Sequence, residues 1–447
     1  MTEKLNIEAF QLVNLVSEKP LDKSAAKSEL FGSMKEKGVS DFAGEFIGDI
    51  IEDQIDYLNE TIEKFVRQKD ENVSLGFFKS EYLIFKEFIS KLYSIDKINN
   101  VFSKSSLERE VFKWIISTYK HKKAEASLSD FLLNIIDDKV KPHIFYFPIL
   151  NLEIEVPFTI GNVEITYFQK DYLDNLYLSL KSNNKSLTSE EFDNIYRKDF
   201  QGQVLAKVTI NAERKKAEEI AKRNAEIAVD VLKLYSDTAY LAEKKSMFDI
   251  NYRIGYQVKT MFLSHNTNEV DNLPISCQFN NYPFKFGEKH LELALNSGLR
   301  IFSKYISKPL NDELYNIIIQ SIGLFSSSIS NWDLHLRCVN LITILESVFL
   351  RDEEEHKMSN KVKSRFSQIA TKNNLEREKI RTVISNIYEV RHKMIHKARR
   401  LPINTKDLSF AQVAIIQVFL NLIHYNAFLK VSNKKALIEI LENQIKK

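Results

Sequence analysis

Three stretches of the chain differ in the spacing of their apolar residues. From the first residue to about residue 140, apolar side chains recur at steps of three and four, which is the period of an amphipathic helix. These stripes are formed by Phe42, Phe46, Ile47, Ile50, Ile51 and Ile55, and by Phe77, Tyr82, Phe85, Phe88 and Ile89. The pattern predicts an N-terminal helical region over residues 1–140 and contains no chemical motif.

The spacing changes to two near Pro142. Apolar and polar residues alternate there in short runs that proline and glycine interrupt, which is typical of strands and turns. Candidate strands lie at 152–156, 163–167 and 204–210, with further ones within 247–263 and 275–286. A long alanine-rich helix is expected at about 211–235. We therefore predict a mixed α/β region over residues 141–290, with a sensor or regulatory role.

From about residue 291 the helical period returns and continues to residue 447. Helices are expected at roughly 290–306, 311–328, 331–350, 356–371, 376–398, 407–430 and 433–446. Asn331 and Asp407 are candidate N-caps, and Pro402 follows a helix end. The third region is thus a helical domain over residues 291–447, and the expected fold class is α+β, mainly α.

Composition excludes several classes of protein. The chain has 44% hydrophobic and 28% charged residues, which is the balance of a folded globular protein and not of a disordered one. Two cysteines, Cys277 and Cys338, are too few for a disulfide framework or a cysteine-based zinc site, and they fit a reducing cytosol. The start, MTEKLNIEAF, lacks the basic and apolar segments of a signal peptide. No stretch approaches the roughly 18–20 apolar residues of a membrane span, so we expect a cytoplasmic protein without membrane contact.

The formal net charge of +3 conceals an asymmetry. Residues 356–400 contain 13 Lys or Arg and 3 Glu, which is a formal charge of +10, so the rest of the chain carries −7. A concentrated basic segment on a nearly neutral chain indicates binding to a polyanion. A solvated helix face accounts for the same charge count equally well.

The basic segment contains a pair of groups suited to cutting RNA. Arg391 and His396 lie five residues apart, late in a predicted helix. An imidazole with a pKa of about 6.5 can take a proton from a ribose 2′-OH or give one to the leaving oxygen. A guanidinium can bind the non-bridging phosphate oxygens as charge builds up on them. Neither step requires a metal or another cofactor.

The helical geometry sets a condition on this pair. Residues five apart point about 140° away from each other on a straight helix, so Arg391 and His396 cannot converge on one phosphate. Either the helix is distorted locally or a second copy of the chain completes the site, as a two-fold homodimer would allow. His392 and His396 share one face, which also resembles two ligands of a zinc site, although no third ligand is evident nearby.

Together with two earlier helices, this stretch resembles the HEPN superfamily, in particular its Apea-like branch. The resemblance covers residues 331–430, about a quarter of the chain. It is carried by Leu341–Leu350 (LITILESVFL), Lys361–Phe366 (KVKSRF) and Ile387–His396 (IYEVRHKMIH). It implies a helical bundle that dimerises and cuts RNA without metal, leaving a 2′,3′-cyclic phosphate and a 5′-hydroxyl. Many members act in bacterial defence against phage, including abortive infection, or as growth-arresting toxins.

The resemblance also assigns roles to residues. Arg391 and His396 become the catalytic pair, and His392 fits the residue types allowed after the arginine. Glu346 and Arg365 match polar positions of the Apea-like pattern and are expected to support the site. The histidine is often followed by glycine in this branch, whereas Lys397 follows here, which leaves the local turn undetermined. Lys393, Lys397, Arg399 and Arg400 are the expected contacts to the RNA backbone.

Each assignment has a plainer alternative. Arg391 could pair with Glu389 at the surface, and His396 could interact with the dipole at the helix C-terminus. Glu346 and Arg365 could form a purely structural ion pair. Lys397 to Arg400 could be a solvated helix end, and both cysteines are expected to be unreactive and buried.

The sequence therefore predicts an endoribonuclease that acts on RNA such as tRNA or mRNA, works as a homodimer and needs no cofactor or metal. An active ribonuclease in the cytosol requires control, so a phage-derived trigger or a separate antitoxin is the expected regulatory partner. The alternative is a non-catalytic RNA-binding or scaffold protein that keeps the HEPN fold.

Overall fold

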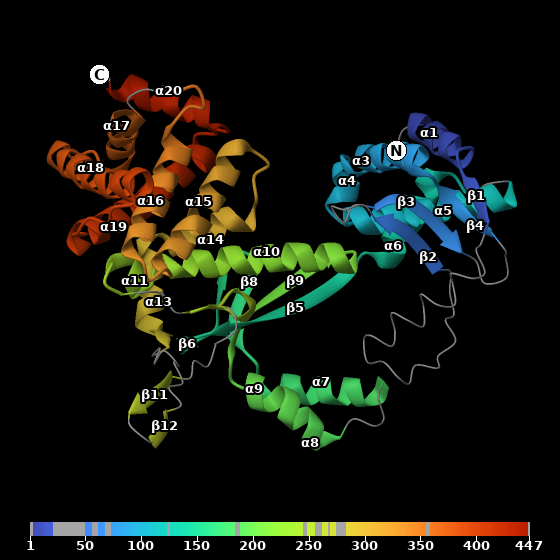
Figure 1. Cartoon of the computed structure of the whole chain (residues 1–447), viewed down its shortest axis with the longest axis horizontal. Coiled ribbons are helices and arrows are strands. Elements are labelled where there is room, and N and C mark those ends of the chain that lie inside the picture. Colours follow the sequence, from blue (N-terminus) through green and yellow to red (C-terminus); the bar gives the residue numbers. More distant parts are fainter. Residues whose placement is uncertain are drawn as a thin grey trace. The chain divides into compact units, whose positions relative to one another are not determined.

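The computed structural model describes residues 3–20, 50–55, 61–67, 73–122, 126–183, 188–244, 248–254, 262–266, 269–273, 283–354 and 358–445. Its fold class is α+β, mainly α, as expected from the sequence (Figure 1). The chain forms two compact units. Unit 1 consists of Met1–His143 with Ile210–Glu219, and unit 2 of Ile144–Thr209 with Ile220–Lys447. The expected boundary at about residue 290 therefore lies inside unit 2.

Unit 1 combines helices with a small antiparallel sheet. The strand order is β1-β4-β3-β2, with β1 at Ser17–Pro20, β2 at Ile50–Ile55, β3 at Thr61–Arg67 and β4 at Val73–Phe77. The helices are α1 (Glu3–Val13), α3 (Lys79–Tyr93), α4 (Asp96–Asn99), α5 (Lys104–His121) and α6 (Leu128–Lys139). Phe77, Phe85 and Phe112 meet in the core, with ring centroids 5.3–6.0 Å apart.

The prediction of a purely helical region over residues 1–140 is wrong, because β1 to β4 lie within it, and the predicted apolar stripe at residues 50–55 is strand β2. In the sheet the backbone of Ile51 lies opposite Val66 of β3. Hydrogen bonding to the neighbouring strand β3 decides the structure of residues 50–55, although the spacing of their apolar residues also fits a helix. The preceding residues of that stripe, Phe42 to Ile47, lie outside the described residues. In the second stripe, Tyr82, Phe85, Phe88 and Ile89 are buried on α3 as predicted, whereas Phe77 is the last residue of strand β4.

Unit 2 contains most of a five-stranded sheet of order β10-β5-β9-β8-β7. Its strands are β5 (Lys141–Leu150), β7 (Phe158–Ile160), β8 (Val163–Tyr167), β9 (Val204–Ala212) and β10 (Asp249–Ile250). Two smaller pairings join β6 (Leu152–Ile154) to β13 (Phe284–Phe286), and β11 (Phe262–Asn266) to β12 (Glu269–Leu273). Strands occur at all three positions expected with the spacing of two, and Cys277 lies outside the described residues.

The expected alanine-rich helix is α10 (Arg214–Lys233), whose Ala217, Ala221, Ala225 and Ala228 are fully buried. Small side chains at steps of three and four let a helix pack closely over its whole length. The shorter helices between the strands are α7 (Lys170–Asn183), α8 (Ser189–Phe192), η1 (Asp193–Arg197), α9 (Lys198–Phe200), α11 (Asp237–Tyr240) and α12 (Asn251–Ile254).

Among the described residues from 288 onward, every regular element of unit 2 is a helix, and each expected helix is present. The helices are α13 (Glu288–Ala294), η2 (Leu295–Leu299), α14 (Arg300–Ser307), α15 (Glu313–Ile329), α16 (Leu334–Phe349), α17 (Met358–Ala370), α18 (Asn374–Lys397), α19 (Thr405–Ile423), η3 (His424–Phe428) and α20 (Lys434–Ile445). Helices α15 to α19 pack against one another, and α20 packs on α17 (Figure 1).

The two expected N-caps are wrong. Asp333 caps α16 by accepting a hydrogen bond from the backbone N–H of His335, and Asn404 caps α19 in the same way. Asn331 instead accepts a hydrogen bond from the backbone N–H of Asp333 at 2.9 Å, so it shapes the turn before the helix. Asp407 lies in the first turn of α19, where its charge interacts favourably with the helix dipole.

Among the described residues, one helix is apolar enough to cross a membrane by length and composition. This segment is Thr405–Phe428, formed by α19 and η3, with a mean hydropathy of 1.5 over its most apolar window. The expectation that no stretch approaches such a span is therefore wrong. Half of that window is buried within the fold, and α19 packs against α15, α17 and α18. A helix enclosed by neighbours on several sides needs such a composition without any membrane.

Candidate active site

Helix α18 carries the candidate motif and is fixed at its start and along one face. The Asn373 side chain accepts hydrogen bonds from the backbone N–H groups of Leu375 and Glu376, which caps the helix. A stripe of Ile380, Val383, Ile384, Ile387 and Val390 is buried against α16, α17 and α19. The last two turns extend beyond this stripe, and the helix continues without a break to Lys397.

Arg391 pairs with a carboxylate of the neighbouring helix α16. Its Nη2 lies 3.5 Å from Oε2 of Glu346, and the two side chains are 28% and 21% exposed. The expected alternative partner, Glu389, is exposed and makes no ion pair with Arg391. The Nε of Arg391 is buried and has no hydrogen-bond partner among the described residues. Glu346 therefore holds the Nη2 end of the Arg391 guanidinium, while the Nε–H donor has no partner among the described residues.

Tyr388 adds a group that the sequence analysis did not select. Its hydroxyl is buried, and its contact with the Glu346 carboxylate is a hydrogen bond of poor geometry. Burial and then the nearby Glu346 carboxylate raise the pKa of this hydroxyl well above its usual value, so it stays protonated. Tyr388 lies three residues before Arg391, and this spacing places both residues on one helix face next to Glu346.

His396 lies on the exposed part of α18, in its last turn. Its ring is 4.9 Å from that of His392, with an angle of 44° between the planes, and both residues are exposed. Because the helix is regular between residues 391 and 396, Arg391 and His396 point in directions about 140° apart. The local distortion that would bring them together within one chain is absent.

The four expected RNA-contacting residues differ in their surroundings. Lys397 and Arg399 are exposed, Lys393 is half-buried, and none of the three forms an ion pair within the part of the chain that the structure describes. Arg400 instead binds Oδ2 of Asp333 through Nη2 at 2.7 Å. Exposed pairs of this kind contribute only about 0–1 kcal/mol, so a phosphate can compete for Arg400.

The turn after His396 is formed without glycine. The last helical residue of α18 is Lys397, and the C-cap Ala398 adopts a left-handed conformation with φ of 48°. The backbone N–H groups of Ala398 and Arg399 both donate to the carbonyl oxygen of Lys393. This closes the helix in the way that a glycine normally does, so Lys397 is an ordinary helical residue.

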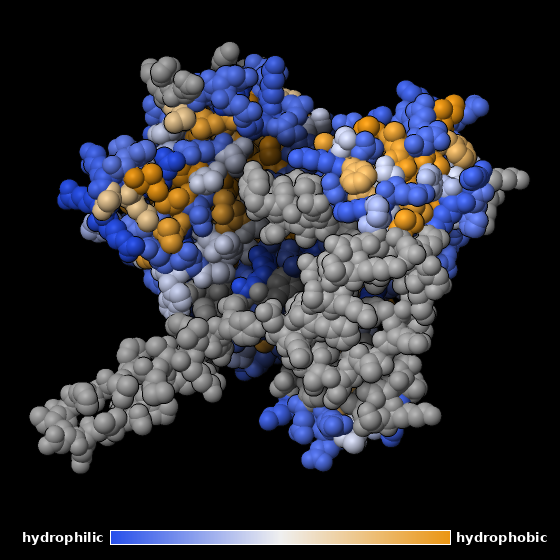
Figure 2. Space-filling model, turned by 45° about the vertical axis from the view of Figure 1, so that its right-hand side comes forward, coloured by the Kyte–Doolittle hydropathy of each residue, from blue (hydrophilic) through white to orange (hydrophobic). Residues whose placement is uncertain are grey.

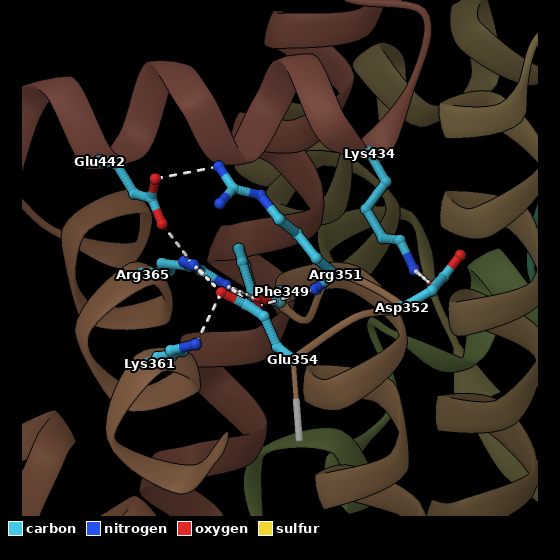
Figure 3. A network of polar contacts seen from close by, with 8 residues as sticks. All are labelled: Phe349, Arg351, Asp352, Glu354, Lys361, Arg365, Lys434 and Glu442. Atoms are coloured by element: carbon cyan, nitrogen blue, oxygen red, sulfur yellow. Dashed lines mark hydrogen bonds and ion pairs between the residues drawn. The ribbon is translucent and has the colours of Figure 1, made fainter. Parts of the chain in front are cut away.

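Arg365 does not pair with Glu346, which excludes the structural ion pair considered for these two residues. It is 2% exposed and donates to both carboxylate oxygens of Glu354, at 2.6 and 2.7 Å (Figure 3). It also donates to the carbonyl oxygen of Phe349 at 2.6 Å and to Glu442 of α20. Hydrogen bonds from Arg365 lower the pKa of Glu354 to about 2. Arg365 thus connects α17 to α20 and to the loop after α16, and any support it gives the site is indirect.

A second buried arginine was also missed by the sequence analysis. Arg337 of α16 is 1% exposed and donates to three carbonyl oxygens, those of Asn331, Ala242 and Lys244, at 2.8–2.9 Å. Burial without a carboxylate lowers the pKa of Arg337 to about 10. The next residue, Cys338, is fully buried, and burial raises the pKa of its thiol to about 12. A thiol in this environment is a poor nucleophile.

Among the described residues, no group of three or more His, Cys, Asp or Glu side chains is placed to hold a metal ion. The chain was also compared with models of protein families, with curated proteins and with solved structures. None of the three comparisons gave a match.

Proposed function

We propose that the chain is a metal-independent endoribonuclease of the HEPN type. The observation that carries the proposal is the end of α18. His396 is exposed there beside Lys393, Lys397 and Arg399, none of which forms an ion pair with another described residue. An imidazole surrounded by unpaired cations is suited to act on a phosphodiester.

The reaction follows from the two groups. The ribose 2′-oxygen attacks the adjacent phosphorus while an imidazole takes its proton. The bond from phosphorus to the 5′-oxygen breaks, and this oxygen receives a proton from an imidazolium or from water. Arg391 binds the phosphoryl oxygens, whose negative charge grows in the transition state. The products are a 2′,3′-cyclic phosphate and a 5′-hydroxyl.

One copy of the chain does not provide both groups at one point, because Arg391 and His396 diverge on a regular helix. We therefore propose a homodimer in which the ends of two α18 helices meet. RNA such as tRNA or mRNA is the proposed substrate, and growth arrest or defence against phage is the proposed role. An antitoxin or a phage-derived trigger would control the activity.

A second function is favoured by one observation. Glu346 lies 3.5 Å from Arg391 and competes with phosphate for its guanidinium. A chain in which this pair persists would bind RNA through Lys393, Lys397 and Arg399 without cutting it. The alternative is therefore a non-catalytic RNA-binding or scaffold protein.

The test is RNA cleavage in EDTA by the purified full chain, with the 5′-ends of the products examined. We expect fragments whose 5′-hydroxyl can be phosphorylated directly by a kinase, and no cleavage of DNA of the same sequence, which lacks the 2′-OH. Arg391→Ala and His396→Ala should each lower the rate by at least about a hundredfold. Arg391→Lys should also be impaired, because lysine keeps the charge but loses the planar fork.

His121→Ala is the matched control. His121 is likewise an exposed histidine in the last turn of a helix, α5, but it belongs to unit 1. Its loss should leave cleavage unchanged. Binding of RNA without cleavage would favour the scaffold function, whereas cleavage that survives in His396→Ala would refute the proposed catalytic role of this residue.

A further inference from the structure

Described residues of unit 2 line a cavity of about 520 Å³. None of them belongs to the candidate active site on α18. The cavity lies between α14, the segment after it up to Leu310, and the end of α19 with η3 and the following loop. The volume falls within the range of cavities that bind small molecules, about 300–1,000 Å³. The proposed nuclease mechanism does not use this cavity.

Four cations surround the cavity. Arg300, Lys304 and Lys308 follow each other at steps of four along α14 and its C-cap, so they share one face of the helix. Lys430 is contributed by the loop after η3 and has a left-handed backbone, with φ of 58°. All four are exposed, and none forms an ion pair within the described part of the chain. Like charges at this spacing repel each other by a few tenths of a kcal/mol per pair, and a bound anion would remove that repulsion.

The remaining lining is apolar. Apolar side chains reach the surface at several places (Figure 2), and here Ile301 and Phe428 are 46% and 62% exposed. Leu310, Ile423 and Ala427 line the cavity beside them. Exposing two large apolar side chains next to each other costs free energy that an apolar ligand would recover.

Carboxylate, amide and aliphatic hydroxyl groups are missing from the described lining side chains, and Tyr305 provides the one side-chain oxygen among them. The cavity has no Asp, Glu, Asn, Gln, Ser or Thr among its described lining residues. The hydroxyl of Tyr305 already donates to Oδ1 of Asn426 at 2.8 Å. Asp312, which lies near Tyr305, accepts hydrogen bonds from the Tyr315 backbone N–H and from the Asn426 amide. A nucleobase with several N–H donors would find only the Tyr305 hydroxyl oxygen as a side-chain acceptor here, and each donor left unpaired costs about 1–3 kcal/mol.

From this combination we propose that the cavity binds an amphiphilic carboxylate of the fatty-acid type. The acyl chain lies against Ile301, Ile423 and Phe428, and the carboxylate is bound by the cations of α14 and Lys430. The inference is independent of the nuclease proposal, because it involves none of the same residues.

The test is titration of the full chain with dodecanoate below its micellar concentration, followed by calorimetry. Dodecanol and dodecyltrimethylammonium serve as neutral and cationic probes with the same chain. We expect saturable binding of dodecanoate and at least about tenfold weaker binding of both other probes, because four cations favour a carboxylate. Raised salt should weaken the binding of dodecanoate.

Two sets of variants test separately how the charges and the apolar side chains of the cavity contribute to dodecanoate binding. Lys304→Glu combined with Lys308→Glu should weaken dodecanoate binding by at least about tenfold, and Phe428→Ser should do so without changing the charge. All three positions are exposed, so the fold should tolerate these changes. Lys435→Glu is the matched control, since Lys435 is an exposed lysine of α20 that does not line the cavity.

Three outcomes would overturn the proposal. Equal binding of dodecanol and dodecanoate would mean an unselective apolar surface. Tighter binding of ATP than of dodecanoate would mean a nucleotide site. Binding to phosphatidylglycerol vesicles without binding of soluble dodecanoate would mean a membrane-contacting surface.

Discussion

At the scale of residues, the surroundings of Glu346 decide how the candidate site can work. This carboxylate lies at the edge of an otherwise buried helix face and holds Arg391 at 3.5 Å. Tyr388 lies beside it with its hydroxyl buried and without a regular hydrogen bond among the described residues. A buried hydroxyl whose hydrogen bond is poorly aligned, as that of Tyr388 to Glu346 is, contributes little to stability. The fold therefore depends little on this polar group of the site.

This leads to a prediction for two tyrosines. Tyr388→Phe should leave the melting temperature nearly unchanged, because the Tyr388 hydroxyl makes only a poorly aligned hydrogen bond to Glu346. Tyr305→Phe is the matched change at a hydroxyl that donates to Asn426 at 2.8 Å, and it should destabilise by about 1 kcal/mol. Thermal melting of both variants checks this. A clear loss of stability in Tyr388→Phe would mean that the hydroxyl makes a strong hydrogen bond in the folded protein, which would contradict the prediction.

At the scale of elements, helix ends and buried ion pairs fix the helices around the site. Helix α18 ends at Ala398 in a left-handed conformation, although the sequence offers no glycine there. Helix α17 is held by the Arg365 network, which reaches α20 and the loop after α16. The end of α18 depends on local backbone hydrogen bonds, whereas the Arg365 network joins residues that are far apart in the chain.

Ala398→Gly should stabilise the chain by about 1 kcal/mol, because glycine adopts a left-handed conformation without the strain that an alanine carries. Lys122→Gly should act in the same direction, since Lys122 ends α5 with φ of 51°. Melting temperatures measure both effects. A lower melting temperature for Ala398→Gly would contradict the left-handed helix end.

The Arg365 network predicts a loss of stability in acid. The pKa of Glu354 is about 2 in the folded chain, against 4.5 for an unperturbed glutamate. A carboxyl whose pKa is lowered by folding stabilises the fold fully above the higher value, and this contribution is lost as the pH falls towards the lower one. The shift corresponds to at most about 3 kcal/mol.

The measurement is the melting temperature of the wild type and of Glu354→Gln as the pH is lowered. The wild type should be more stable near neutral pH, and the difference should shrink steadily below about pH 4.5. A difference that does not depend on pH would mean that the carboxylate charge contributes nothing. Asp237→Asn is a matched control, because Asp237 pairs with Lys244 at a site where both side chains are more than half exposed.

At the scale of the whole molecule, the regular α18 makes the proposed nuclease depend on a second chain. If each site takes Arg391 from one chain and His396 from the other, inactive variants can complement each other. A mixed dimer of Arg391→Ala and His396→Ala has one site with both groups and one site with neither. Random exchange of subunits would then restore roughly a quarter of the wild-type rate.

The experiment mixes the two purified variants under conditions that allow exchange and measures RNA cleavage in EDTA. Each variant alone, and a mixture of His396→Ala with the double variant, should remain inactive. Failure of the mixture to recover activity, with exchange demonstrated independently, would place both groups of the site in one chain.

Much of the architecture could be predicted from the sequence, and the errors have a common cause. The C-terminal helices and the strands at 152–154, 163–167 and 204–212 agree with the expected pattern, because spacing along the chain is a local property. Strand β2 was assigned to a helix because its stability comes from pairing with β3. The N-caps were misplaced by two or three residues, since competing Asn and Asp residues stand close together around the start of each helix.

By itself, the sequence determined the helical character of the C-terminal region and the concentration of positive charge in residues 356–400. It also determined that Arg391 and His396, five residues apart, point in different directions from one helix. These follow from local periodicity and composition. Tertiary structure alone decided that Arg391 pairs with Glu346, that Arg365 binds Glu354 and Glu442, and that cations of α14 and Lys430 surround one cavity. Arg365 and Glu442 are 77 positions apart, and such partners are chosen by how helices pack, which spacing along the chain does not encode.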